Sequence, residues 1–152
     1  MPSNLLQVPH YKQSRGGSCL PAATRMILDF LGYPLSEAEL AQRLGTKSFG
    51  TPAPNLRRLE EIGFSVVYGS GALSNIKDYI QKGIPCLAFV QTGDLPYWGE
   101  NTAHVIVIVG IDDDNIYIND PAFEIAPQSV PLDYFLLAWS EFDHRYAVIQ
   151  SD

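Results

Sequence analysis

Several features are scarce in this sequence, and each scarcity excludes a class of protein. The 152 residues hold only two cysteines, Cys19 and Cys86, which are too few for a disulfide framework and lack metal-ligand spacing. The longest apolar run, Val105 to Val109, is far below the roughly 20 residues that cross a bilayer, and Met1–Asn4 opens no signal peptide. The sequence therefore predicts a cytoplasmic protein with reduced thiols and no membrane segment.

Positive charge is also scarce. Ten Lys and Arg residues stand against seventeen Asp and Glu residues, so the formal net charge is −7. This balance gives little electrostatic support for binding nucleic acid or an anionic membrane surface. Hydrophobic residues make up 46% and charged residues 18% of the chain, as in ordinary globular proteins. At roughly 150 residues per domain, residues 1–152 are expected to form one domain with its own core.

Hydrophobic periodicity changes between the two halves of the sequence. Apolar residues at helical spacing predict helices at 19–31, 36–45, 55–62 and 74–82, and a glycine ends or follows each of these segments. A capping box at Ser36 and Glu39 opens the second helix. Segments rich in Val, Ile, Tyr and Phe then predict strands at 84–91, 103–112, 115–119 and 146–150, with one helix at 132–140. Helices followed by strands argue for an α+β fold in which N-terminal helices pack on an antiparallel sheet.

Cys19 occupies a position that suits a reactive thiol. It follows the flexible loop 15–18 and opens the most strongly periodic helix, with Pro21 in the first turn, where a missing N–H costs nothing. The partial positive charge of a helix N-terminus favours thiolate over thiol. The alternative is a small apolar residue at a helix start, because free cysteine is commonly buried.

His104 and Asp120 give Cys19 two candidate partners. His104 begins an apolar strand, where an imidazole is a poor packing choice unless it has a partner or a task, and Asp120 ends the next strand before a proline. An odd-numbered turn around Asp113 would put both side chains on one face of the hairpin, and an even-numbered turn would put them on opposite faces. We expect the shared face, with Val105, Val107 and Val109 on the other, and Asn119 as the replacement if Asp120 points away.

These residue types together suit acyl transfer. A nucleophilic thiol, a histidine that acts as general base and a carboxylate that orients the histidine form the thiol version of a catalytic triad. Such chemistry also needs hydrogen-bond donors for the developing oxyanion. Gln13, six residues before Cys19, could bring its side-chain amide beside the Cys19 backbone N–H.

At these positions the sequence resembles the double-glycine-leader, or bacteriocin-processing, peptidases of the papain-like cysteine peptidase superfamily. Three blocks carry the resemblance, which spans nearly the whole chain: Gln13 six residues before Cys19, Pro21-Ala22-Ala23 with Met26, and His104 to Gly110 leading to Asn119-Asp120-Pro121. It implies a papain-like fold with Cys19 as nucleophile, His104 as base, Asp120 as orienting residue and Gln13 as oxyanion donor.

The resemblance implies a cysteine peptidase that acts on a peptide or protein substrate. Leu20 departs from the glycine that usually follows the cysteine in that family, and the larger side chain could narrow the cleft. The chain resembles stand-alone members more than those fused to membrane and ATP-binding domains. A non-catalytic peptide-binding module and an acyltransferase with the same triad remain the alternatives, and the cleavage site and oligomeric state stay open.

The remaining polar and aromatic candidates receive simpler interpretations. Cys86 lies in a continuous apolar run and is expected in the core, while His10 and His144 are expected at the surface or at strand edges. Asp112–Asp114 lacks the spaced ligands of a calcium loop and is interpreted as a solvated turn. Tyr97 and Trp98, in the long loop before His104, are candidates for a cleft wall or a local packing cluster. No metal or cofactor is expected.

Overall fold

A six-stranded antiparallel sheet with helices on both faces forms the framework of the protein. The computed structural model describes residues 5–152; residues 1–4, from which the sequence predicts no signal peptide, lie outside the described residues. The helical segments are α1 (Cys19–Phe30), α2 (Glu37–Leu44), η1 (Ala53–Ile62), α3 (Leu73–Gln81), η2 (Thr92–Asp94) and α4 (Leu132–Ser140). The strands are β1 (Phe64–Ser70), β2 (Cys86–Gln91), β3 (Ala103–Ile111), β4 (Asn115–Asn119), β5 (Gln128–Pro131) and β6 (Arg145–Ser151).

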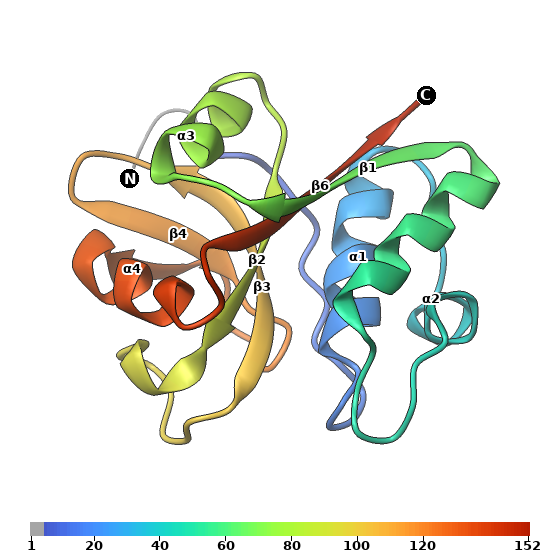
Figure 1. Ribbon diagram of the computed structural model, residues 1–152, viewed down its shortest axis with the longest axis horizontal. Coiled ribbons are helices and arrows are strands. Elements are labelled where there is room, and N and C mark those ends of the chain that lie inside the picture. The colour runs from blue at the N-terminus through green and yellow to red at the C-terminus, as the bar shows by residue number, and fades with distance from the viewer. Residues whose placement is uncertain (1–4) are drawn as a thin grey trace.

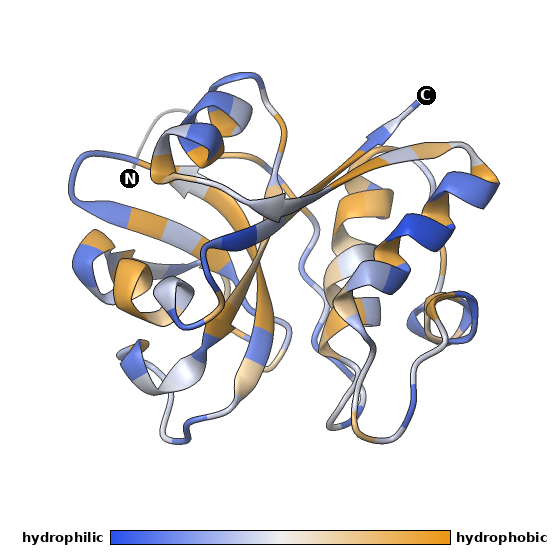
Figure 2. Ribbon diagram, in the orientation of Figure 1, coloured by the Kyte–Doolittle hydropathy of each residue, from blue (hydrophilic) through white to orange (hydrophobic). Residues whose placement is uncertain are grey.

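The strands of the sheet lie in the order β1-β6-β2-β3-β4-β5, and the sheet separates two hydrophobic cores. Figure 1 shows α1, α2 and η1 on one side of the molecule and α3 and α4 on the other. Alternate residues of β3 face the two cores, with Val105 and Val107 packed toward α1 and Ile106 and Ile108 packed toward α4. Figure 2 shows this strand almost entirely hydrophobic, as a strand buried on both faces should be. The predicted α+β class is confirmed.

Local chemistry explains how α2 begins and ends and how η1 begins. The predicted capping box at α2 is present, since the Ser36 side chain accepts from the Glu39 backbone while the Glu39 carboxylate accepts from the Ser36 N–H. Gly45 closes α2 in the left-handed conformation that favours glycine. The segment predicted as a helix at 55–62 begins earlier and winds as the 3₁₀ helix η1, with the Asn55 N–H bonded to the Pro52 carbonyl.

Two strands were not predicted from the sequence. β1 is an edge strand in which Phe64 and Val66 face the core while Ser65 and Val67 face outward, and its short alternation lies between two helical series. β5 has only four residues and ends at Pro131, also at an edge of the sheet. β1 pairs with β6 near the other end of the chain, and β5 pairs with the preceding strand β4 across residues 120–127; local periodicity reports neither pairing.

The β3–β4 hairpin contains a β-bulge that decides which side chains share a face. Ile111 pairs with Ile116 across the even-numbered segment 112–115, which alone would place His104 and Asp120 on opposite faces. Val109 is an extra residue between the Ile108–Ile118 and Gly110–Tyr117 pairs, and it shifts the register by one. The predicted shared face of His104 and Asp120 is therefore correct, but it is produced by the bulge and not by an odd-numbered turn.

The N-terminal segment before α1 lies along the hairpin and the turn that follows it. The Leu6 N–H donates to the carbonyl of the bulged Val109, and the Asn119 side-chain amide donates to the Val8 carbonyl. These bonds hold residues 6–13 in an extended path toward the start of α1. Within residues 5–152, no helix combines the length and the apolar character needed to cross a membrane.

Candidate active site

Cys19 is the first residue of α1 and lies at the end of a tightly folded loop. The buried Ser18 hydroxyl donates to the Arg15 carbonyl at 2.7 Å, which closes the loop directly before the helix. Gly17 adopts a φ of +81°, and a Cβ there would lie 2.6 Å from the Ser48 carbonyl oxygen. Only glycine fits such a conformation beside another backbone segment. The loop thus leaves Cys19 partly exposed while Leu20 is buried beneath it.

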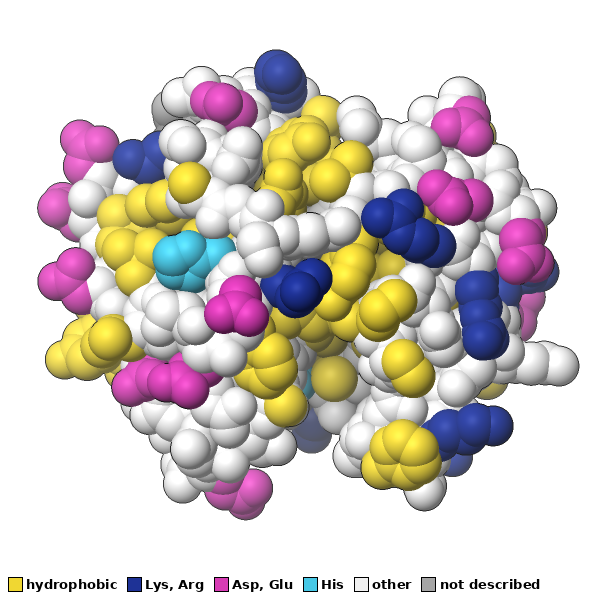
Figure 3. Space-filling view, in the orientation of Figure 1, with side chains coloured by type: hydrophobic (Ala, Val, Ile, Leu, Met, Phe, Trp, Pro, Cys, Tyr) yellow, Lys and Arg dark blue, Asp and Glu magenta, His cyan; other side chains and the backbone are white. Residues whose placement is uncertain are grey.

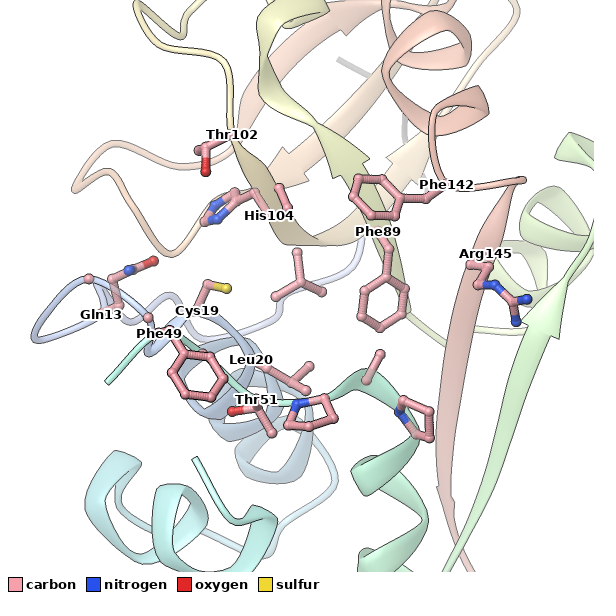
Figure 4. Close-up of a pocket in the computed structure, with 18 of the residues that line it drawn as sticks. Gln13, Cys19, Leu20, Phe49, Thr51, Phe89, Thr102, His104, Phe142 and Arg145 are labelled. Atoms are coloured by element: carbon pink, nitrogen blue, oxygen red, sulfur yellow. The ribbon is translucent and has the colours of Figure 1, made fainter. Parts of the chain in front are cut away.

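His104 and Asp120 form a buried pair beside Cys19. The His104 Nε2 lies 2.6 Å from the Asp120 Oδ1, and the two side chains are 5% and 0% exposed. Cys19 lies beside the His104 ring (Figure 4), and its interaction with that ring contributes to the pKa of His104. Because Asp120 occupies Nε2, Nδ1 is the ring nitrogen left for the thiol. The structure brings together these three residues from α1, β3 and the end of β4.

The electrostatics of the pair favour opposite charges. Burial by itself lowers the pKa of His104, but the hydrogen bonds and negative charges of Asp120 and Cys19 outweigh it and raise the pKa to about 9. Burial raises the pKa of Asp120, yet the hydrogen bond and positive charge of His104, with a hydrogen bond from Tyr97, hold that pKa below its ordinary value. His104 is therefore an imidazolium and Asp120 a carboxylate at neutral pH.

Three more donors hold the Asp120 carboxylate. The Tyr97 hydroxyl donates to Oδ2 at 2.7 Å and the Trp98 indole N–H donates to the same oxygen at 2.9 Å. The Ala122 backbone N–H donates to Oδ1 at 2.9 Å. The sequence indicated Tyr97 and Trp98 as candidates for a cleft wall. Trp98 does line the cleft, whereas Tyr97 contacts Asp120 and is not among the residues that line it.

Gln13 lies at the rim of the same site, close to Cys19 (Figure 4). Its backbone N–H donates to the Pro121 carbonyl at 2.6 Å, directly after Asp120 in the chain. Its side-chain Nε2 donates to the Arg15 carbonyl at 2.9 Å, and its Oε1 is buried without a hydrogen-bond partner. One amide hydrogen of Gln13 is thus bonded to the Arg15 carbonyl, and its second amide hydrogen has no partner among residues 5–152.

A cleft of about 760 Å³ opens at this site, between the α1 side of the molecule and the sheet. Figure 3 shows a hollow there with hydrophobic side chains at its edges. The apolar part of its lining comes from seven segments of the chain, and besides His104 the charged residues in the described lining are Glu100 and Arg145. The apolar lining residues include Leu20, Phe49, Pro52, Pro54, Tyr68, Phe89, Trp98, Val105 and Phe142.

The other polar candidates lie elsewhere. Cys86 is fully buried in the α4-side core, as predicted, and burial raises its pKa to about 12. The Asp112 carboxylate accepts from the Asp114 and Asn115 backbone N–H groups, so this segment is a turn. His10 is not an ordinary surface residue, because its Nε2 lies 2.6 Å from the Phe123 carbonyl oxygen. Among residues 5–152, no cluster of His, Cys, Asp or Glu could hold a metal ion.

Solved structures of peptidase domains share this fold. A C39-like peptidase from Bacillus anthracis superposes with a TM-score of 0.80 at 15% identity, covering 97% of this chain and 98% of that one. The peptidase domain of Streptococcus ComA, a bifunctional ABC transporter, gives 0.79 at 18% identity, with 96% and 100% covered. A double glycine motif protease from an AMS/PCAT transporter, solved with its leader peptide, gives 0.75 at 17% identity, with 100% and 97% covered. The chain has the papain-like fold of C39 peptidase domains.

Sequence comparison assigns the family. The model of the Peptidase_C39 like family matches residues 5–149, and this chain belongs to that family. An uncharacterized protein of Methanothermobacter marburgensis is 39% identical over 111 residues, which are 73% of this chain and 70% of that protein. An uncharacterized protein of Methanothermobacter thermautotrophicus is 34% identical over 110 residues, which are 72% and 69% of the two chains. The resemblance expected from the sequence is confirmed at the level of family and fold.

Proposed function

We propose that the protein is a cysteine peptidase in which Cys19, His104 and Asp120 form the catalytic triad. The observation that carries this proposal is the buried 2.6 Å contact between His104 Nε2 and Asp120 Oδ1, with the Cys19 thiol against the same imidazole at the floor of a cleft. A packing role alone does not account for a charged pair at this depth, because burying both ions is costly. Membership of the Peptidase_C39 like family supports the same assignment.

The reaction follows from the charges of the site. The Cys19 thiolate attacks the carbonyl carbon of a peptide bond, and the carbonyl oxygen takes up the negative charge. The Cys19 backbone N–H and the free amide hydrogen of Gln13 are the donors for that oxygen. The imidazolium of His104 then gives its proton to the leaving nitrogen, the C–N bond breaks, and an acyl-enzyme remains at Cys19. Water, deprotonated by neutral His104, releases the acid product and regenerates the thiolate–imidazolium pair.

The cleft supports a peptide as the substrate. Its walls are mainly apolar, and the lining includes Leu20, which directly follows Cys19 in the chain. One neighbour of the same fold was solved with a leader peptide. We propose that this chain takes an extended peptide with small residues at the scissile bond and apolar side chains against the aromatic wall. A strong requirement for large charged residues beside the cleaved bond would contradict this.

A peptide library analysed by mass spectrometry tests the function. The wild type is expected to cleave a subset of peptides at one type of bond, and Cys19→Ala is expected to bind the same peptides without cleaving them. Reaction in H₂¹⁸O distinguishes the chemistry, since hydrolysis places ¹⁸O in the new carboxylate whereas transfer to an amine does not. Tight binding by the wild type without turnover of any peptide, amide or thioester would establish a non-catalytic binding module instead.

A further inference from the structure

The two oxygens of the Asp120 carboxylate have different partners. Oδ1 accepts from His104 Nε2 and from the Ala122 backbone N–H, at 2.6 and 2.9 Å. Oδ2 accepts from the Tyr97 hydroxyl and the Trp98 indole N–H, at 2.7 and 2.9 Å. A carboxylate offers about four lone-pair positions, so these four donors satisfy it completely. Rotation of the carboxylate away from His104 would break several charge-assisted hydrogen bonds at once.

The two aromatic donors are themselves held in place. Phe123 packs edge-on against the Tyr97 ring and the Trp98 ring, with ring centroids 5.2 Å apart in each case. The Trp98 ring also packs edge-on against the His104 imidazole at 4.9 Å. Trp98 therefore contacts both members of the His104–Asp120 pair, and it lines the same cleft as His104.

We propose that Tyr97 and Trp98 are positioning residues of this site. Their two hydrogen bonds fix the Asp120 carboxylate as an anion, in the orientation that presents Oδ1 to His104. The inference rests on the proposed function, in which Asp120 is the carboxylate that orients His104. Tyr97 and Trp98 act through Asp120 and take no part in bond making or breaking.

The surroundings of Asp120 define what the loss of one donor would do. The titratable groups facing it are His104 from β3 and Tyr97 from the loop after η2, while Cys19 from α1 reaches it only through His104. Without one donor, a lone pair of the buried Oδ2 loses its partner, and the charged carboxylate is stabilised less, relative to the neutral acid, than in the wild type. Asp120 would then take up a proton at a higher pH.

Carbon-13 NMR titration of the Asp120 carboxyl carbon tests this directly and needs no substrate. The variants are Tyr97→Phe, which removes only the hydroxyl, and Trp98→Phe, which keeps an aromatic ring without the N–H. Each is expected to raise the pKa of Asp120 by about one pH unit, the effect of one charge-assisted hydrogen bond. Tyr33→Phe is the matched control, since Tyr33 is half exposed and lies away from Asp120, against Phe64. An unchanged pKa of Asp120 in folded Tyr97→Phe and Trp98→Phe overturns the inference.

The pH dependence of the reaction provides the second measurement. The acid limb of kcat/KM is expected to move to higher pH in both variants, because Asp120 stabilises the imidazolium only as a carboxylate and a carboxyl with a raised pKa is protonated sooner as the pH falls. A role in packing alone would lower thermal stability without moving either the Asp120 titration or this limb. Failure of the wild type to cleave any peptide would refute the proposed peptidase, whereas the NMR titration would still decide the roles of Tyr97 and Trp98.

Discussion

The backbone N–H of Gln13 donates a 2.6 Å hydrogen bond to the carbonyl of Pro121. This bond joins the segment that carries the proposed oxyanion donor to the turn that carries the proposed orienting carboxylate. Gln13 and Asp120 lie more than a hundred positions apart in the chain, yet a single turn fixes both. A shift of this turn would therefore disturb the proposed oxyanion donor and the base together.

Asp120→Asn is expected to leave the fold intact and to reduce kcat/KM by about 10- to 10⁴-fold. The amide keeps the shape of the side chain but removes the charge that stabilises the imidazolium, and it lets His104 adopt the wrong tautomer; the upper value is the known cost of that tautomer in a triad. Steady-state kinetics on a cleaved peptide, with circular dichroism as the check on folding, measure the effect. Full activity of the folded variant would remove Asp120 from the triad.

Gln13→Ala is expected to lower kcat by about 10²- to 10³-fold, as for loss of one oxyanion donor. Gln7→Ala is the matched control, because Gln7 belongs to the same N-terminal segment, is exposed and, within residues 5–152, donates its side-chain amide to the Leu5 carbonyl alone. The control is expected to keep wild-type kinetics. Equal kinetics for the two variants would show that the Gln13 amide does not stabilise the oxyanion.

Iodoacetamide near neutral pH is expected to label Cys19 much faster than Cys86. Cys19 is partly exposed at the cleft, whereas Cys86 is fully buried and its pKa is raised to about 12. Peptide mapping by mass spectrometry over a time course separates the two rates. Slow labelling of both thiols at similar rates would contradict an activated nucleophile at Cys19.

The free energy of unfolding is expected to fall between pH 6.5 and about 9 because of His104. The folded-state pKa of this imidazole is raised from 6.5 to about 9, so its stabilising effect is complete below the lower value and is lost as the pH passes the higher one. The slope is at most about 1.4 kcal/mol per pH unit. Urea unfolding across this range measures it, and Asp120→Asn is expected to flatten the decline. The same decline in that variant would contradict the coupling.

Gly17→Ala is expected to destabilise the protein by about 1–3 kcal/mol and to reduce turnover. The new Cβ would meet the Ser48 carbonyl oxygen at 2.6 Å in a left-handed backbone conformation, and it would displace the loop that presents Cys19. Gly16→Ala is the control, because a Cβ at Gly16 would contact nothing within 4 Å. Thermal unfolding and peptide cleavage of the two variants should therefore differ, and equal behaviour would show that the loop accommodates the methyl group.

Local sequence signals predicted the elements that depend on local chemistry. The capping box and the glycine that ends the helix were sufficient to predict α2. The apolar stripe was sufficient to predict α4, which has the bounds that its periodicity predicts. The missed strands β1 and β5 lie at the two edges of the sheet, where pairing with the neighbouring strand, β6 or β4, decides the structure. Periodicity within a short segment carries no information about such a partner.

The residues of the candidate site also divide into those that the local sequence predicts and those that it does not. Residue type and spacing were enough to select Cys19, His104 and Asp120, because each stands out against the chemistry of its neighbours. The partners of Asp120 were not found, since Tyr97 and Trp98 reach it through a loop whose path the sequence does not define. The available signal was a pair of aromatic residues with polar tips in the loop that precedes the strand of His104.

Because of the bulge at Val109, the number of residues in this hairpin decides whether the side chains of His104 and Asp120 lie on the same face. Side chains alternate along each strand, so inserting or deleting one residue between His104 and Asp120 would exchange their relative faces and separate the pair. A change of two residues would preserve the arrangement. We therefore expect active relatives of different hairpin length to differ by two residues, or to pair any single insertion in the turn with a gain or loss of the bulge.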